Sequence, residues 1–114
     1  KGVLRTCQEK GLGSFLSVLK TLKDEHAGPL SFPVEGYTLT LDIPMSDATK
    51  ELAKELDGIV ELTGGRLYLT KDALMTKEFF ERTYPRHEDW KKIKKKYDPR
   101  GKFTSEQSRR VGLS

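Results

Sequence analysis

The sequence contains very little cysteine and histidine, and it lacks long apolar runs. Its 114 residues include one cysteine, Cys7, so no disulfide can form within the chain, which is typical of a reducing compartment. The two histidines, His26 and His87, are far apart in the sequence, whereas a zinc site needs several clustered ligands. No apolar run approaches the ~20 residues of a membrane-spanning helix. We therefore expect no metal site, and a cytoplasmic location that is either free or peripheral to the membrane.

Several functional motifs are also missing. The sequence has no G-x-G-x-x-G, no P-loop pattern and no G-x-S-x-G nucleophile elbow. The glycines of GLG at 11–13 and of TGG at 63–65 are better interpreted as helix ends. Local motifs alone therefore identify no catalytic centre. The chain also starts at Lys1 without an initiator methionine or an apolar signal segment, so we expect a fragment of a longer protein or a processed chain.

The positive charge is concentrated in one segment. The chain has a net charge of +4, and residues 86–102 hold eight Lys or Arg and three Asp or Glu. The first interpretation is the solvated face of a helix at about 87–97, whose Trp90, Ile93 and Tyr97 pack on the core. The alternative is a free-standing α+β interaction module that binds an acidic partner or RNA through residues 86–102. Acidic residues flank the lysines, so we favour the first interpretation and expect no nucleic acid as a partner.

The periodicity of apolar residues predicts an α+β fold. Residues 37–43 alternate between apolar and polar and form the clearest strand, and residues 66–70 are predicted as a second strand. Residues 14–22 fit both a helix and a strand, and periodicity leaves both open. The other expected elements are a loop over 23–36, a turn at 98–101, and helices over 3–10, from Ser46 or Asp47 to about Leu62, over 76–84 and over 87–97. This order predicts an antiparallel or mixed β-sheet with helices packed on one face, as in a ferredoxin-like split βαβ unit that lacks its first strand.

Helices on one face would leave the other face of this sheet polar. The residues expected to face the helices are Tyr37, Leu39, Leu41, Leu67 and Leu69. The opposite face would carry Thr38, Thr40, Tyr68 and Thr70, with Lys20 beside them if residues 14–22 form a strand. A solvated sheet face is the simpler interpretation. The functional interpretation is one wall of a binding site for a hydroxylated or phosphorylated ligand, completed by another domain.

Four segments, taken together, resemble the C-terminal part of FAD-linked oxidoreductases of the vanillyl-alcohol-oxidase superfamily, most closely the decaprenylphosphoryl-ribose 2′-oxidase group. They occur in the order of that family and cover nearly the whole chain: SFLSVLKTL, GPLSFPVEGYTLTLDIP, GGRLYLTKD and YPRHEDWKKIKKKYDPRGKFTSEQSRRVGL. The resemblance places residues 14–22 in a strand. It also implies an enzyme that oxidises the CH–OH group of a sugar, polyol or lipid-linked sugar by hydride transfer to FAD.

The resemblance further implies a partner domain. Such proteins hold FAD mainly in an N-terminal domain, which this chain does not contain in recognisable form, and a second domain caps the flavin. Residues 1–114 are then a single domain, a fragment of the substrate-binding cap, and residues 98–114 are a tail that returns toward the flavin domain. The fragment alone is expected to be inactive and without bound FAD, and its exposed sheet face could self-associate as an artefact of truncation.

The resemblance assigns site residues position by position. In the lipid-linked ribose oxidases, lysines corresponding to Lys20 and Lys71 lie beside the substrate and the flavin, so both are expected to contact the cofactor, and Lys71 is the candidate catalytic residue. Lys71 could act as a base, orient the alcohol or stabilise charge on the reduced flavin. The residues expected to bind substrate are Lys20, Leu22, Thr38, Thr40 and Tyr68. Three of them change the family's chemistry, since its members have an aromatic residue at position 22, Asn at 38 and Cys at 40.

Overall fold

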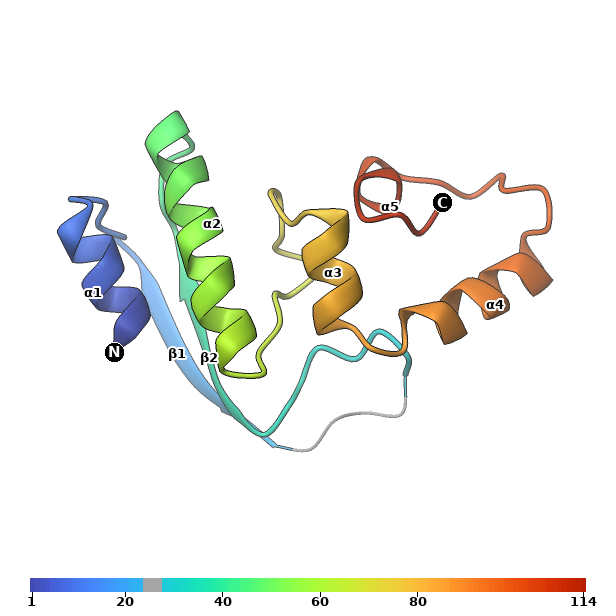
Figure 1. The fold of residues 1–114 in the computed structure, drawn as a ribbon, viewed down its shortest axis with the longest axis horizontal. Coiled ribbons are helices and arrows are strands. Elements are labelled where there is room, and N and C mark those ends of the chain that lie inside the picture. Colours follow the sequence, from blue (N-terminus) through green and yellow to red (C-terminus); the bar gives the residue numbers. More distant parts are fainter. Residues whose placement is uncertain (24–27) are drawn as a thin grey trace. The chain divides into compact units, whose positions relative to one another are not determined.

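The computed structural model describes residues 1–23 and 28–114 (Figure 1). The described chain divides into two compact units. Residues 1–23 and 33–65 form the N-terminal unit, and residues 28–32 and 66–114 form the C-terminal unit. The loop expected over residues 23–36 includes residues 24–27, which lie outside the described part of the chain. The α+β class is confirmed, because the described residues combine helices with a two-stranded antiparallel sheet.

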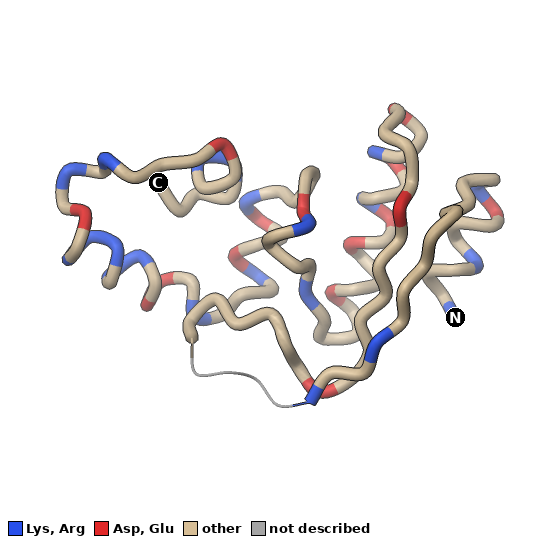
Figure 2. The backbone as a smooth tube through the Cα atoms, turned by 180° about the vertical axis from the view of Figure 1, so that it is seen from behind, with Lys and Arg blue, Asp and Glu red and all other residues tan. Residues whose placement is uncertain are grey.

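A β-hairpin and two helices make up the N-terminal unit. Strand β1 (Ser17–Leu22) pairs with β2 (Gly36–Leu41), which confirms that the ambiguous run at 14–22 contains a strand. Helices α1 (Gly2–Glu9) and α2 (Asp47–Leu62) lie on the same side of this hairpin, in front of it in Figure 1 and behind it in Figure 2. The expected single-sided layering is therefore present within this unit.

Helix α2 has the start and the end that its sequence predicts. The Ser46 hydroxyl accepts a hydrogen bond from the Thr49 amide at 3.1 Å, which satisfies one of the amides left without a helical partner in the first turn. Leu52 is buried at 1% exposure and anchors the apolar stripe. The helix ends before Gly64, whose φ of +69° is a left-handed conformation that glycine adopts without a steric penalty.

The C-terminal unit contains three helices and an apolar core. The helices are α3 (Lys77–Thr83), α4 (His87–Tyr97) and α5 (Glu106–Arg110). The Thr76 hydroxyl caps α3 by accepting from the Phe79 amide at 3.2 Å. The core residues that are almost fully shielded from solvent are Met75, Phe79, Phe80, Tyr84 and Val111. Both predicted helices over 76–84 and 87–97 are confirmed.

The predicted strand over 66–70 is wrong. Residues 66–68 have no regular secondary structure and residues 69 and 70 lie in a turn, and none of them pairs with another strand in the described part of the chain. Their carbonyl oxygens are bonded by side chains instead: the Tyr84 hydroxyl donates to the Leu67 oxygen at 2.6 Å, and the Gln107 side-chain amide donates to the Leu69 oxygen. Alternation of apolar residues specifies two faces, but it does not supply the neighbouring edge that a strand needs.

Two expectations about buried residues are also wrong. Tyr37 is 78% exposed, so the helices do not cover that end of the hairpin, whereas Leu39 and Leu41 are half-buried as expected. On α4, Ile93 and Tyr97 are 49% and 75% exposed, and the helix contributes no fully buried residue. The apolar stripe of α4 was expected to pack on the core, but the almost fully buried residues of this unit come from α3, from Met75 and Tyr84 on either side of it, and from Val111 after α5.

Candidate functional site

The hairpin places Lys20, Leu22, Thr38 and Thr40 on one face. In the antiparallel register Lys20 lies directly opposite Thr38, and Thr40 lies opposite Val18. Directly opposed residues share a face, and alternate residues of one strand share it too, so Leu22 joins them. The structure therefore brings four of the predicted substrate-binding residues together.

This face points away from the first helix. The other face of the hairpin carries Ser17 and Leu41, which line a hollow together with Leu4 and Cys7 of α1. On the predicted binding face the Lys20 side chain is exposed, while Thr38 and Thr40 are half-buried. The face thus offers one ammonium and two hydroxyl groups, which can hydrogen-bond to the oxygens of a polyhydroxylated ligand.

Tyr68 and Lys71 lie in one exposed turn of the C-terminal unit. The Lys71 amide donates to the Tyr68 carbonyl oxygen at 2.9 Å, which closes the turn. The Tyr68 ring packs against the ring of Phe32 with centroids 4.7 Å apart, and Tyr68 remains 44% exposed. Lys71 is also exposed. A phenol and an ammonium are therefore presented to solvent from a turn whose backbone is hydrogen-bonded.

The segment leading into this turn is held by a buried tyrosine. Tyr84 has no exposed surface, and its hydroxyl donates to the Leu67 carbonyl. Burial raises the pKa of Tyr84 to about 12, although the nearby Arg66 guanidinium opposes this shift. The phenol consequently stays protonated at neutral pH and remains a hydrogen-bond donor.

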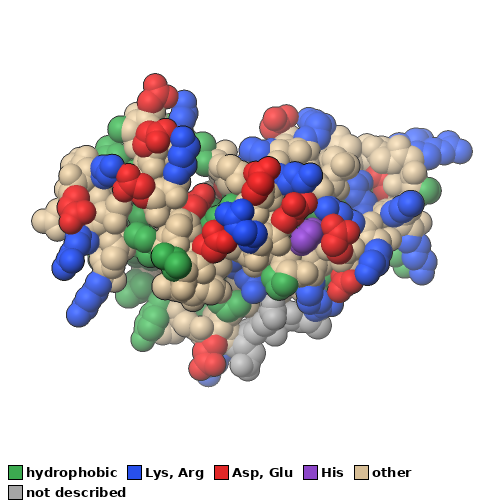
Figure 3. Space-filling model, viewed as in Figure 1, with side chains coloured by type: hydrophobic (Ala, Val, Ile, Leu, Met, Phe, Trp, Pro, Cys, Tyr) green, Lys and Arg blue, Asp and Glu red, His purple; other side chains and the backbone are tan. Residues whose placement is uncertain are grey.

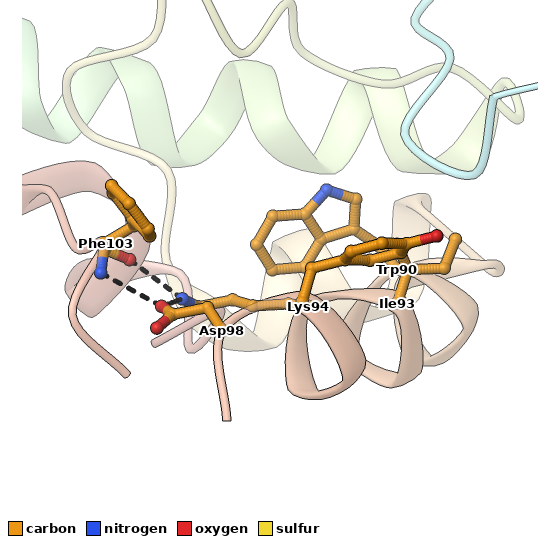
Figure 4. Close-up of a pocket in the computed structure, with 6 residues that line it drawn as sticks. Trp90, Ile93, Lys94, Asp98 and Phe103 are labelled. Atoms are coloured by element: carbon orange, nitrogen blue, oxygen red, sulfur yellow. Dashed lines mark hydrogen bonds and ion pairs between the residues drawn. The ribbon is translucent and has the colours of Figure 1, made fainter. Parts of the chain in front are cut away.

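An open aromatic hollow lies at the C-terminal end of α4 (Figure 4). It has a volume of about 290 Å³ and is lined by Trp90, Ile93, Lys94, Tyr97, Asp98 and Phe103. The Asp98 carboxylate accepts hydrogen bonds from the Lys94 ammonium at 2.7 Å and from the Phe103 amide at 3.0 Å. These bonds, that to Lys94 first, lower the pKa of Asp98 to about 2. The carboxylate is thus ionised at neutral pH and fixes one wall of the hollow.

The basic residues of α4 are accompanied by acidic partners. Basic positions are crowded along α4 in Figure 2, but Figure 3 shows acidic side chains among the basic ones on the face in view. Lys91 pairs with Glu88 at 2.8 Å and Lys92 pairs with Asp89 at 3.2 Å. Because these ion pairs reduce the local positive potential, they favour the interpretation of α4 as a solvated helix over that of an RNA-binding surface.

Residues 1–23 and 28–114 contain no group of three or more His, Cys, Asp or Glu that could hold a metal ion. Within the same residues, no helix combines the length and the apolar character that crossing a membrane requires.

The hairpin face and the 68–71 turn, each taken by itself, carry polar groups that can donate hydrogen bonds. Lys20 and Lys71 carry ammonium groups, and Tyr68 carries a phenol, all of which can donate to the oxygen and nitrogen atoms of an isoalloxazine ring. The sequence contains no glycine-rich loop that could cradle phosphates. The donors of each unit therefore fit the chemistry of an isoalloxazine ring, and the sequence offers no recognisable motif for the phosphates of FAD.

Sequence reasoning missed the residues that hold the 68–71 turn. Asp72, Gln107 and Arg110 were within the segments that carried the family resemblance, but no role was predicted for them. The structure shows all three bonded around the turn. Their separations of up to 38 residues leave no local periodicity by which the contacts could have been found.

Comparison with known proteins identifies the family. The family model described as D-arabinono-1,4-lactone oxidase matches residues 37–111. The decaprenylphosphoryl-β-D-ribose oxidase of Mycolicibacterium smegmatis is 39% identical over 113 residues, which is 99% of this chain and 25% of that protein. A Streptomyces coelicolor protein, described as an uncharacterized protein in the mprA 5′ region, is 32% identical over 112 residues, or 97% of this chain and 30% of that protein. The chain thus spans between a quarter and a third of the length of these relatives. The resemblance inferred from the sequence is confirmed, and the chain belongs to the D-arabinono-1,4-lactone oxidase family of FAD-linked oxidases.

Proposed function

We propose that this chain is the substrate-binding portion of an FAD-dependent oxidoreductase that oxidises the CH–OH group of a sugar, polyol or lipid-linked sugar. The observation that carries the proposal is the hairpin face on which Lys20 lies opposite Thr38, with Thr40 and Leu22 beside them. The named activity of the mycobacterial relative supports the same reaction class. The flavin is held by an N-terminal domain outside this sequence, which is the partner of this chain, and residues 98–114 are the tail that returns toward it.

The residues of the chain have separate tasks in this reaction. The hydroxyls of Thr38 and Thr40 and the ammonium of Lys20 hydrogen-bond to substrate oxygens and orient the carbinol carbon. FAD, when bound, would supply the acceptor for the hydride that leaves that carbon. Lys71 presents an ammonium that stabilises the negative charge developing on the flavin ring, and Tyr68 lies beside it in the same turn. The remaining proton of the alcohol passes to solvent or to a base.

The side chains on the hairpin face set the choice of substrate. Leu22, Thr38 and Thr40 are smaller or differently polar than the aromatic residue, Asn and Cys that the resemblance places there in the decaprenylphosphoryl-ribose oxidases. An asparagine amide presents an acceptor oxygen and a separate donor nitrogen, whereas a threonine hydroxyl donates and accepts at one atom, and this difference changes the hydroxyl pattern that the site accepts. The substrate is therefore a hydroxylated compound of the same class, with a different arrangement of hydroxyls or a different lipid.

Replacement of Lys71 tests this proposal. In the full-length protein that contains this chain, Lys71→Met should slow flavin reduction by about 10²-fold, the usual effect of removing one group that stabilises developing charge. The measurement is stopped-flow absorbance of the flavin, mixed with a panel of sugar lactones, alditols and polyprenylphosphoryl ribose. Lys95→Met, which removes another exposed lysine of the same unit, is the matched control and should leave the rate unchanged. Equal rates in Lys71→Met and wild type would refute the role of Lys71.

A further inference from the structure

A buried carboxylate follows directly after Lys71. The side chain of Asp72 is only 2% exposed, and a buried charge is stable only when it is paired and hydrogen-bonded. One carboxylate oxygen accepts from the backbone amides of Leu74 at 3.0 Å and Met75 at 2.7 Å. The other oxygen accepts from Arg110 of α5 at 2.8 Å. Asp72 is therefore fixed both by its own loop and by a helix 38 residues later in the chain.

Arg110 holds two points of this loop at once. One guanidinium nitrogen donates to the Asp72 carboxylate, and another donates to the Met75 carbonyl oxygen at 2.5 Å. The planar guanidinium group spreads its donors in a fixed fork, which the single ammonium of a lysine cannot reproduce. Arg110 thus fixes the loop that begins immediately after Lys71.

Gln107 fixes the chain on the other side of Lys71. It lies three residues before Arg110 on α5, so the two side chains project from the same face of the helix. Its side-chain amide donates to the carbonyl oxygen of Leu69, two residues before Lys71. One face of α5 therefore bonds to the backbone at residue 69 and to the side chain of residue 72.

We propose that Asp72, Gln107 and Arg110, which we call the α5 clamp, position the turn that carries Lys71. The clamp fixes the chain before and after the turn, the bond from the Lys71 amide to the Tyr68 carbonyl closes it, and the lysine side chain remains exposed. Arg110 is a positioning residue, because it contacts the loop that follows the turn and not the reacting atoms. The effect of the clamp on catalysis rests on the function proposed for Lys71. The hydrogen bonds that form the clamp do not depend on that function.

The first experiment tests the clamp without any cofactor. Amide hydrogen exchange of Lys71 is measured by NMR on the 114-residue chain. Arg110→Met should accelerate exchange at least about 10-fold, because the turn opens when its tether is lost. Arg109→Met is the matched control: it removes the neighbouring charge on α5, whose side chain is 57% exposed and pairs with Glu106. Arg110→Lys, which keeps the charge beside Asp72 without the fork, should give an intermediate rate and serves if Arg110→Met does not fold. Equal exchange in the Arg109 and Arg110 variants would overturn the clamp.

The second experiment measures the flavin midpoint potential of the full-length protein. A positive charge near the ring favours the reduced flavin, so Lys71→Met should lower the potential and Arg110→Met should lower it in the same direction. The double variant should show no larger shift than Lys71→Met alone, because Arg110 acts through Lys71. A shift in Lys71→Met without one in Arg110→Met, or additive shifts, would overturn the positioning role. No shift in Lys71→Met would refute the proposed function and leave the first experiment to decide the clamp.

Discussion

Asp98 fixes the turn after α4 with a single carboxylate. Besides the bonds to Lys94 and Phe103, it accepts from the Lys102 amide at 2.8 Å. The backbone of the predicted turn is closed by the Gly101 amide, which donates to the Asp98 carbonyl at 3.0 Å, and Gly101 has a φ of +61°. The DPRG sequence therefore forms the turn that it predicts, and the aspartate adds bonds that reach beyond it.

The stability contribution of Asp98 should disappear in acid. Its pKa is lowered from 3.8 to about 2 in the folded chain, so the unfolded chain binds the proton first as the pH falls. The contribution is present above pH 3.8 and is lost as the pH falls through about 2. Thermal unfolding should show Asp98→Asn melting below wild type at pH 7, with the two converging near pH 2. Glu106→Gln, which changes a carboxylate whose side chain is 90% exposed, should follow wild type at both values. A gap for Asp98→Asn of equal size at pH 7 and pH 2 would contradict this account.

The position of a single residue could be predicted from the sequence where it depended only on its neighbours along the chain. Lys20 and Thr38 share a face because alternation along a strand is fixed over a few residues. The α5 clamp depends on side chains meeting across 38 residues, which no pattern in one sequence encodes. The family resemblance indicated that Lys71 matters, but it did not indicate what holds it.

Helices were predicted more reliably than strands, because a helix carries its own start and stop signals. The cap at Ser46, the apolar stripe of α2 and the glycines after it are all local. The segment 66–70 has an equally clear alternation, yet it lies against side chains and not against another strand. Whether an alternating segment becomes a strand depends on another strand, distant in the sequence, whose edge is free to pair with it.

The N-terminal cap of α2 allows a test of what stabilises a single helix. Ser46→Ala removes the acceptor of the Thr49 amide and should lower the free energy of unfolding of the N-terminal unit by about 1 kcal/mol. Ser46→Asn should recover most of the loss, since asparagine is an equally good capping residue. Urea unfolding followed by circular dichroism measures both variants. If alanine and asparagine destabilise the unit equally, the capping bond is not the cause.

At the scale of the whole molecule, the chain is a family member that covers 25–30% of its relatives' length. Its fold class and family could be predicted from the sequence, the first from periodicity and the second from motifs spread over nearly all of the chain. The division into two compact units was not predicted. The division depends on which segments pack together. Residues 28–32 belong to the C-terminal unit, although residues 33–65, which follow them in the sequence, belong to the N-terminal unit.

The 114-residue chain should be colourless after purification. Under the proposed function, most of the interactions that retain FAD are made by another domain, and this sequence contains no recognisable phosphate-binding motif. Visible absorbance and equilibrium dialysis with FAD measure retention, and the full-length protein, purified in the same way, should be yellow. Stoichiometric FAD in the short chain would contradict the assignment of the cofactor to another domain.

The open aromatic hollow beside α4 has an optical consequence. Trp90 is the only tryptophan in the sequence, and it lines that hollow together with Tyr97 and Phe103. Indole emission moves to shorter wavelengths when water is excluded from the ring. The protein therefore carries a single indole fluorophore, located at that surface, and its emission wavelength distinguishes a hollow filled with solvent from one that has been covered.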